Sequence, residues 1–383
     1  MRAMKDSGVE WIGEIPQEWT IVRTKYIASI TNGCDPKTEG NVPVYGSGDG
    51  SFKSCGEYKE GPAVLLGRKG ATLHIPHYVN GKYWNVDTAF DVKMVSDRFE
   101  LKYYYALSMC FDYKYYTSTT TLPSMTQTNY GNMYLPFPSR AEQSRIIAFI
   151  ETKCAKIDAL IAAKEKTNAL LKERRQSIIY EAVTKGLDPT VPMKDSGVEW
   201  IGEIPGTWST RKTKYIGTFK SGDGITSESI SDDDKYPVYG GNGIRGYTDR
   251  FTHEGSYILI GRQGALCGNV HLVRGSFWAS EHAVVGDIVP DFEIRLAFYI
   301  LTAFNLNRLS VTAAQPGLSV DQIINVIVPM PGSAEEQKEI CDYLDINCTE
   351  ADSVIELNER TIRQLKEYRQ SLIYEAVTGK IEV

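Results

Sequence analysis

The chain has 383 residues, of which 42% are hydrophobic and 23% charged, with seven cysteines and a formal net charge of −6. This composition is that of a globular protein of two or three domains, and it excludes nucleic-acid binding through bulk positive charge, although a local basic patch remains compatible with it. No apolar run is long enough to span a membrane, the N-terminus lacks a signal peptide, and the cysteines form no C-x-x-C pair, so we expect a cytoplasmic protein with reduced thiols.

The first informative segment is MKDSGVEWIGEIP at residues 4–16, because the chain repeats it letter for letter at residues 193–205. Other segments that recur are TKYI (24–27 and 213–216), PVYG (43–46 and 237–240), GRKG (67–70, as GRQG at 261–264) and RQSIIYEAVT (175–184, as RQSLIYEAVT at 369–378). The spacing between copies grows from 189 to 194 residues, so about five extra residues lie near SISDDDKY in the second copy. We therefore expect two similar domains, each built from a unit of about 190 residues and related by a pseudo-two-fold axis.

Each copy begins with a globular part, at roughly residues 15–139 and 204–333. Short β-like runs such as PAVLLGR and SYILIGR alternate there with glycine turns, and each part has one helical segment, LKYYYALSM or IRLAFYILT. This mixture predicts a compact α+β domain. The prolines of LPFP (135–138) and VPMP (328–331) separate each globular part from the segment after it, because proline discourages helix before it.

A long helix is expected after each globular part. Residues 140–185 and 334–378 contain no proline or glycine, and their apolar residues follow a heptad-like spacing. The apolar positions are Ile147, Ile150, Cys154, Ile157, Ile161, Leu171 and Ile178, then Cys341, Leu344, Cys348, Ala351, Ile355, Ile362, Leu365 and Leu372. Helices about 65 Å long need a partner, so we expect them to pack on each other. Lys164, Asn168 and Asn358 interrupt the stripe, and polar residues at such positions commonly fix the register.

Charge favours pairing between these two helices. Residues 140–185 hold ten Lys/Arg and six Asp/Glu, whereas residues 334–379 hold five and eleven. Opposite net charges and an intervening domain favour an antiparallel pair; the alternative is that each helix packs on its own globular domain. In a two-fold unit the C-terminus then lies near the N-terminus, and the repeated box is the junction between a helix and a globular domain.

The predicted fold class is α+β, with two similar α+β domains separated by two long antiparallel coiled-coil helices. The predicted domains are a first globular domain with the N-terminal box (1–139), a first long helix (140–186), a second globular domain (187–333), and a second long helix with the C-terminal tail (334–383).

Motifs of catalysis are not found in the sequence. It contains no G-x4-GK[ST] loop, no GxGxxG after a strand and no NPPY- or DPPY-like motif, so we expect no catalytic residues and no cofactor in this chain. His74 and His77 form an HxxH pair, but only His77 has a counterpart histidine in the second copy, which argues against a metal site. Asp49 with Glu57 and Lys59 imitates a nuclease spacing, yet the second copy lacks it, which favours an exposed charged loop.

Polar, glycine-rich loops recur at equivalent places: YGSGDGSFK (45–53) and YGGNGIRGY (239–247), then GRKG and GRQG. Glycine permits close approach of the backbone to a ligand, Arg and Lys bind phosphate or guanine, and Asn and Gln suit adenine. The framework is shared but the tips differ, with Lys69 opposite Gln263, so we expect two different ligands of one kind. The alternative is that Arg68 and Arg262 only bind acidic neighbours.

In the tyrosine-rich segment 103–121 we expect most aromatic side chains in the core and Lys114 and Thr119 to Thr121 at the surface. The candidate DNA-binding residues are Tyr45, Ser47, Asp49, Lys53, Arg68, Lys69, Lys82, Lys114, Thr119 and Thr120 in the first copy, and Tyr239, Asn242, Arg245, Arg262, Gln263 and Arg274 in the second. They are chosen by loop, because no single position is matched to a base.

Taken in order and in duplicate, these motifs resemble the specificity (S) subunit of type I restriction–modification systems over essentially the whole chain. The motifs that carry the resemblance are EWIGEIPQEW, PVYG, GRKG and GRQG with Trp84 and Trp278, the AEQ and AEEQ helix starts, and the helix ends RQSIIYEAVTKG and RQSLIYEAVTGK.

The resemblance implies a non-catalytic subunit in which each globular domain reads one half of a split double-stranded DNA target and the helices set the gap. It also implies two methyltransferase (M) subunits that bind S-adenosylmethionine, and restriction (R) subunits that use ATP and Mg²⁺. Because the loop tips differ, we expect an asymmetric target. Two alternatives stay open: a specificity subunit for a methyltransferase–nuclease outside type I, and a coiled-coil scaffold that binds protein or carbohydrate.

Overall fold

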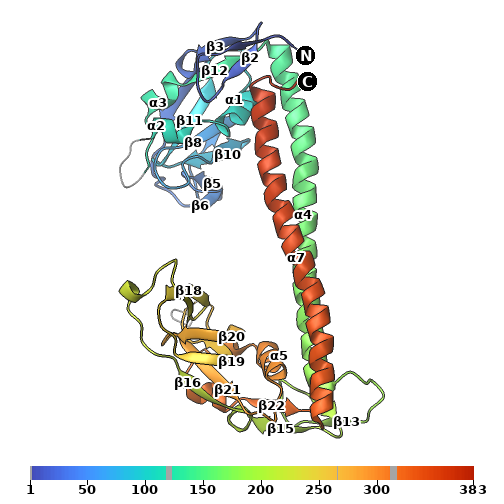
Figure 1. The fold of residues 1–383 in the computed structure, drawn as a ribbon. Coiled ribbons are helices and arrows are strands. Elements are labelled where there is room, and N and C mark those ends of the chain that lie inside the picture. Colours follow the sequence, from blue (N-terminus) through green and yellow to red (C-terminus); the bar gives the residue numbers. More distant parts are fainter. Residues whose placement is uncertain (1, 118–122, 265, 311–316) are drawn as a thin grey trace. The chain divides into compact units, whose positions relative to one another are not determined.

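The computed structural model describes residues 2–117, 123–264, 266–310 and 317–383 (Figure 1). The chain forms two compact units: residues Met1–Glu165 with Glu359–Val383 make the first unit, and Lys166–Asn358 make the second. Each unit contains one globular domain and a part of both long helices. The units therefore divide the helices between them, whereas the predicted domain boundaries fall at the helix ends.

The globular domain of the first unit is a mixture of strands and short helices, as predicted. Its elements are β1 (Met4–Asp6), β2 (Glu14–Pro16), β3 (Thr20–Arg23), β4 (Ala28–Asn32), β5 (Val42–Tyr45), β6 (Ser51–Cys55), β7 (Lys59–Glu60), β8 (Ala63–Gly67), β9 (His77–Val79), β10 (Lys82–Asn85), β11 (Ala89–Met94), α1 (Leu101–Ser108), α2 (Tyr113–Tyr116), α3 (Gln127–Asn132) and β12 (Tyr134–Phe137). One sheet has the order β4-β11-β8-β9 and another β6-β5-β10-β7, with small ribbons from β1 with β2 and β3 with β12.

The second unit follows the same chain order, with a few replacements. Its elements are β13 (Met193–Asp195), β14 (Glu203–Pro205), β15 (Ser209–Lys212), β16 (Gly217–Ser221), β17 (Tyr236–Gly240), β18 (Gly243–Thr248), β19 (His253–Gly261), β20 (Val270–Ala279), β21 (Ala283–Ile288), α5 (Ile294–Phe304), α6 (Val320–Ile324) and β22 (Ile327–Met330). β19 stands in place of β7 and β8, β20 in place of β9 and β10, and a short 3-10 helix (Leu306–Leu309) in place of α2. Here one sheet, β16-β21-β19-β20-β17-β18, covers what is two sheets in the first unit. The two sheets of the first unit separate at Gly61 and Pro62, whereas the counterparts Gly255 and Ser256 lie within β19 and pair with Gly275 and Arg274 of β20.

The two long helices are α4 (Arg140–Lys185) and α7 (Ala334–Val377). In the first unit, Asp158 binds Arg369 at 3.0 Å and Glu165 lies 3.9 Å from Lys366, so α7 runs backward as α4 advances. In the second unit the counterpart pair Arg175 and Asp352 lies 3.1 Å apart. The antiparallel pairing predicted from the charges is confirmed, with α4 and α7 side by side in each unit (Figure 1).

Polar residues do lie in the seam between the helices. The side chain of Asn358 donates a hydrogen bond of 2.8 Å to Asn168, and both residues are buried. In the first unit the seam is apolar, formed by Ile157, Ile161 and Ile362. Because an amide in an apolar seam is satisfied only opposite a polar partner, the Asn pair specifies one register of the helices.

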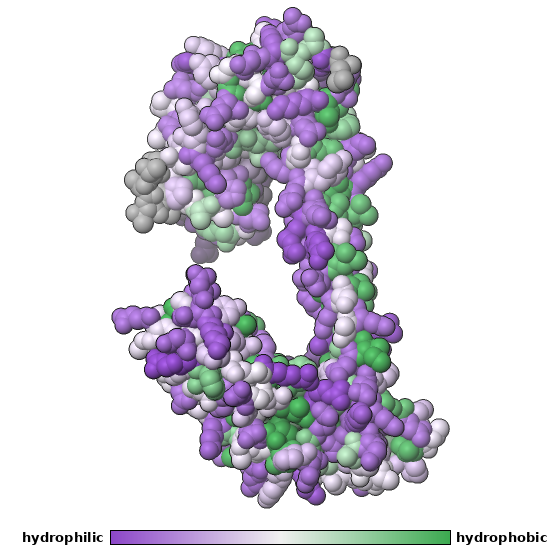
Figure 2. Space-filling model, in the orientation of Figure 1, coloured by the Kyte–Doolittle hydropathy of each residue, from purple (hydrophilic) through white to green (hydrophobic). Residues whose placement is uncertain are grey.

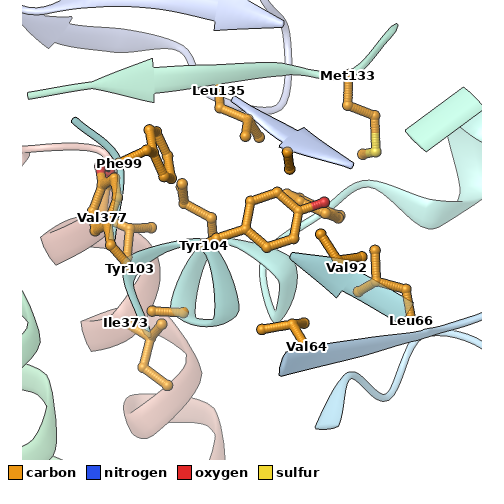
Figure 3. Close-up of a cluster of buried hydrophobic side chains, with 14 of the residues drawn as sticks. Val64, Leu66, Val92, Phe99, Tyr103, Tyr104, Met133, Leu135, Ile373 and Val377 are labelled. Carbon is orange, nitrogen blue, oxygen red and sulfur yellow. Dashed lines mark hydrogen bonds between the residues drawn. The ribbon is translucent and has the colours of Figure 1, made fainter. Parts of the chain in front are cut away.

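The core of the first unit joins the globular domain to α7. Figure 3 shows Val64 and Leu66 of β8 facing Tyr104 of α1, with Ile373 and Val377 of α7 closing the cluster beside Tyr103. The hydroxyl of Tyr103 donates a 2.7 Å hydrogen bond to the carbonyl of Val377. Each helix thus packs on its own globular domain only at its start, on the other globular domain at its end, and on its partner helix between the two. The tyrosines of this segment are mostly core, as expected, although Tyr115 is exposed.

The repeated box forms the same corner in both units. The indole N–H of Trp19 donates to the carboxylate of Glu142 at the start of α4 (2.9 Å), and that of Trp208 donates to Glu336 at the start of α7 (2.8 Å). The backbone of Ile12 accepts from Tyr374 of α7 at 3.1 Å, as Ile201 accepts from Tyr180 of α4 at 3.2 Å. The N- and C-terminal residues meet at the first of these corners, as predicted (Figure 1). Among the described residues, no helix has both the length and the apolarity needed to cross a membrane.

Candidate nucleic-acid interface

In the second unit, four loops that are far apart in sequence come together. This second loop cluster consists of residues 221–223, 240–242, 262–264 and 280–282. A Cβ atom at Gly241 would lie 3.0 Å from the carbonyl oxygen of Gln263 and 3.3 Å from that of His282, so glycine favours this close approach of three loops. The backbone N–H of Arg262 donates to the His282 carbonyl at 2.9 Å, and its carbonyl accepts from Leu318 at 2.9 Å.

The first unit has an equivalent first loop cluster, made of residues 46–48, 68–70, 86–88 and 123–125. The backbone N–H of Arg68 donates to the Thr88 carbonyl at 2.7 Å, and its carbonyl accepts from Met125 at 2.9 Å. A Cβ atom at Gly70 would lie 3.3 Å from the hydroxyl oxygen of Ser47. The loops that the sequence pairs by repeat are thus brought together by the same backbone bonds in both units.

The two arginines of GRKG and GRQG hold their loops in place. Arg68 donates from Nη1 to the carbonyl of Asp87 at 3.2 Å. Arg262 donates from Nε to the carbonyl of Leu318 at 3.3 Å and from Nη1 to the hydroxyl of Ser221 at 3.0 Å. These partners are carbonyl and hydroxyl oxygens, not the acidic side chains of the alternative interpretation. A guanidinium has five N–H donors, so each arginine can hold its loop and still offer donors to a ligand.

The residues after the arginines are exposed and differ between the units. Lys69 occupies this position in the first loop cluster and Gln263 in the second. The amide oxygen of Gln263 lies 3.0 Å from Nδ1 of His282, whose Nε2 lies 3.1 Å from a carboxylate oxygen of Glu281. In the first unit the position of His282 is taken by Thr88. The tips therefore differ in the side chains around them as well as in the tip residue.

The two candidate tyrosines pack against aromatic rings next to the loop clusters. The half-buried ring of Tyr45 lies 5.5 Å from that of His77, whose Nε2 is 2.7 Å from the carbonyl of Gly48. Tyr239 packs edge-on against Phe277 at 5.6 Å, and burial raises the pKa of its hydroxyl. Asp49 and Lys53 are exposed, and Ser47 is half-buried.

Asn242 and Arg245 lie on the hairpin of β17 and β18. The Asn242 side chain accepts a hydrogen bond from Asn269 at 3.4 Å. The stem of Arg245 crosses Gly240, where a Cβ atom would lie 2.5 Å from Cδ of the arginine, and this residue is exposed. Figure 2 shows hydrophilic side chains gathered where Figure 1 places β18. A hydrophilic surface of this kind suits a wet, phosphate-rich ligand.

Other candidates lie outside the two loop clusters. Lys82 lies opposite Glu60 in β10, with its ammonium 4.0 Å from the ring centre of Tyr58. Arg274 lies opposite Ser256 in the middle of β20, and Lys114 is exposed on α2. Lys82 and Arg274 lie on strands and not at loop tips. The sequence could not show this difference, because a lysine or arginine on an exposed sheet face has the same sequence signature as one in a loop. Thr119, Thr120 and Thr121 lie outside the described residues.

The nuclease-like spacing has a structural role. The carboxylate of Glu57 accepts hydrogen bonds from the hydroxyl of Thr38 at 2.6 Å and from the backbone N–H of Lys37 at 2.7 Å. These hydrogen bonds, of which the one from Thr38 has the largest effect, lower the pKa of Glu57 to about 2. Lys59 instead binds Asp91 at 3.1 Å. Among the residues that the structure describes, no group of three His, Cys, Asp or Glu side chains is placed to hold a metal ion.

Several residues in the loop clusters or in contact with them were not among the candidates. Ser221 and Leu318 bind Arg262, and Thr88 and His282 occupy equivalent positions beside the two tips. The sequence did hold a signal for Thr88 and His282. The repeat aligns these two residues with each other, since Thr88 lies between Trp84 and Ala89 and His282 lies between Trp278 and Ala283. No local pattern marks Ser221 or Leu318, which lie 41 and 56 residues from Arg262.

A duplicated α+β fold with two loop clusters on one framework defines a protein with two homologous recognition domains. The family model "Type I restriction modification DNA specificity domain" matches residues 205–367. The chain is 32% identical over 303 residues to the specificity subunit of type I restriction enzyme EcoprrI from Escherichia coli, covering 75% of this chain and 70% of that one. It is 23% identical over 321 residues, 74% of this chain and 71% of the other, to the MjaVIII specificity subunit from Methanocaldococcus jannaschii.

A solved structure from a study of complex assembly and conformational transition in the type I restriction–modification system shares the fold. Its TM-score is 0.72 at 15% identity, and the match covers 96% of this chain and 99% of that one. The chain belongs to the family of specificity subunits of type I restriction enzymes.

Proposed function

We propose that this chain directs a type I restriction–modification enzyme to a split, asymmetric DNA target, with one half bound by the loop cluster of each unit. The observation that carries the proposal is that the same backbone framework presents Lys69 in one unit and Gln263 in the other. A shared framework suits a shared ligand, the DNA duplex, and different tips suit different base sequences.

The chemistry of the loop clusters supports base recognition at a close backbone approach. A Cβ atom at Gly48 of the first loop cluster or at Gly264 of the second would have nothing within 4 Å, so a base edge or phosphate can come near the main chain there. Lysine and arginine donate to guanine O6 and N7 or to phosphate, whereas glutamine has a donor and an acceptor. In this proposal Arg68 and Arg262 position the loops and add donors, and the tips carry the difference in specificity.

The helices have a second role in the proposal. α4 and α7 fix the gap between the two half-sites and, with the corners, bind two methyltransferase subunits. Half-sites about one helical turn apart present the same face of the DNA to both recognition domains. This chain then supplies no catalytic group: the methyltransferase subunits bind S-adenosylmethionine, and restriction subunits use ATP and Mg²⁺. The assembled enzyme works on DNA in the cytoplasm.

The test is to co-express the chain with the methyltransferase subunit of its system in a methylation-free host and to map N6-methyladenine across the genome. We expect one split, asymmetric motif that disappears when this chain is omitted. A matched pair of variants, Lys69→Ala and Gln263→Ala, should each alter a different half of that motif. An assembled complex that methylates no defined sequence would contradict the proposal.

A further inference from the structure

A chain of three polar side chains lies at the tip of the second loop cluster. Nε2 of His282 lies 3.1 Å from Oε1 of Glu281, and Nδ1 of the same ring lies 3.0 Å from Oε1 of Gln263. Glu281 and His282 sit in the tight turn between β20 and β21, which is closed by a 2.9 Å hydrogen bond from the Ala283 N–H to the Ser280 carbonyl. The three side chains form one connected unit, which we name the tip triad.

The backbone holds both ends of the tip triad. The N–H of Arg262, which precedes Gln263, donates to the His282 carbonyl at 2.9 Å, and Gln263 forms a β-bridge with Gly317. The side chains of Glu281 and His282 are 43% and 40% exposed, and Gln263 is exposed. The tip triad is therefore anchored by main-chain bonds and open to a ligand.

The hydrogen bonds determine what Gln263 can offer to that ligand. Both ring nitrogens of His282 face oxygen atoms, Nδ1 that of the Gln263 amide and Nε2 that of the Glu281 carboxylate. The second oxygen of Glu281 is buried and has no hydrogen-bond partner among the described residues, so its carboxylate interacts through His282. With Oε1 of Gln263 occupied by His282, the amide NH₂ group faces away from the ring.

We propose that Gln263 reads a base of the second half-site through its NH₂ group, and that His282 is a positioning residue that holds the amide in this donating orientation. The inference rests on the proposed function. Guanine offers two acceptors in the major groove, N7 and O6, whereas adenine offers one acceptor and one donor. An amide that can rotate pairs with adenine through both its atoms, but an amide whose oxygen is occupied favours guanine. The expected base opposite Gln263 is guanine, in place of the adenine that glutamine alone suggests.

The first unit supplies the comparison. The first unit has Lys69 at the position of Gln263. The ammonium group of lysine can only donate hydrogen bonds, so it needs no partner to orient it. Thr88 replaces His282 there. The substitution Gln263→Lys thus brings a donor to the second unit that does not depend on His282, and it should preserve guanine recognition when His282 is removed.

The experiment is the genome-wide methylation map of the complete methyltransferase complex with variants of this chain. His282→Ala should admit adenine at the guanine position of the second half-site, lowering the guanine preference about 5- to 150-fold. Gln263→Glu, which has no amide donor, should lose guanine at that position and favour cytosine. Gln263→Lys combined with His282→Ala should keep guanine. The control Thr88→Ala should leave the second half-site unchanged.

Each other outcome has a defined meaning. A motif that is unchanged in both His282→Ala and Gln263→Glu, or a wild-type base other than guanine at the position that Gln263 variants alter, would overturn this inference and leave the proposed function standing. An even loss of methylation across all sequences in His282→Ala, with no rescue by the added Gln263→Lys, would show a structural or direct DNA-binding role for His282. A wild-type complex without any defined motif would overturn the proposed function and the inference together.

Discussion

Replacing Asn358 by leucine tests whether the buried amide pair sets the register of α4 and α7. Asn168 and Asn358 are only 6% and 7% exposed and share a 2.8 Å hydrogen bond. The substitution leaves the Asn168 oxygen, which accepts this bond, buried beside an apolar side chain, and an unsatisfied buried polar group costs about 1–3 kcal/mol. We therefore expect Asn358→Leu to lower the free energy of unfolding by about that amount.

The double variant Asn168→Leu/Asn358→Leu separates register from stability. Two leucines in the seam bury apolar area and leave no amide unpaired, so we expect the double variant to regain the lost stability, with a coupling energy of about 0.5–3 kcal/mol. The assay is urea unfolding followed by circular dichroism, analysed as a double-mutant cycle on the whole chain. Single variants as stable as the wild type, or additive effects, would refute the reasoning that the hydrogen bond is needed in the seam.

Three further predictions concern the two globular domains. Arg262→Ala should relax or weaken methylation at the second half-site only, as read from methylation maps, and an equal loss at both half-sites would contradict independent recognition. Gly261→Ala should destabilise the second unit, because a Cβ atom there would lie 2.0 Å from the Gly241 carbonyl oxygen, and a melting temperature equal to that of the wild type would contradict it. Hydrogen bonds lower the pKa of Glu57 from 4.5 to about 2, so its contribution to stability is present above pH 4.5 and is lost as the pH falls toward 2; Glu57→Gln should weaken this acid dependence in melting experiments, and an unchanged pH profile would count against it.

The repeat made much of the fold predictable from the sequence. A proline- and glycine-free stretch with heptad spacing marks α4 at Arg140–Lys185, and the charge difference between two such stretches predicts the antiparallel pair that the ion pair of Asp158 with Arg369 confirms. These features are periodic or local, so they can be read along the chain.

The loop clusters were predictable only in outline. The repeat indicates which loops are equivalent, but Arg262 reaches partners 41 and 56 residues away, and no periodic pattern carries that information. Lys82 and Arg274 were chosen for their charge, yet the strand register places them away from the loop tips. His282 was missed because a single histidine without a sequence motif has no visible function until the turn brings it to Gln263. The role in DNA binding of every candidate residue stays a prediction.

The contact between α7 and the first globular domain has a consequence for biosynthesis. Tyr103 binds Val377, 274 residues later, and Leu372, Ile373 and Ala376 belong to the same core. A chain that leaves the ribosome from its N-terminus must therefore keep the first unit unfinished until its last helix is made. The second unit is one uninterrupted segment, Lys166–Asn358, which is complete while the ribosome is still adding α7. The first unit therefore needs the last-made part of α7 to complete its core, whereas the second unit does not.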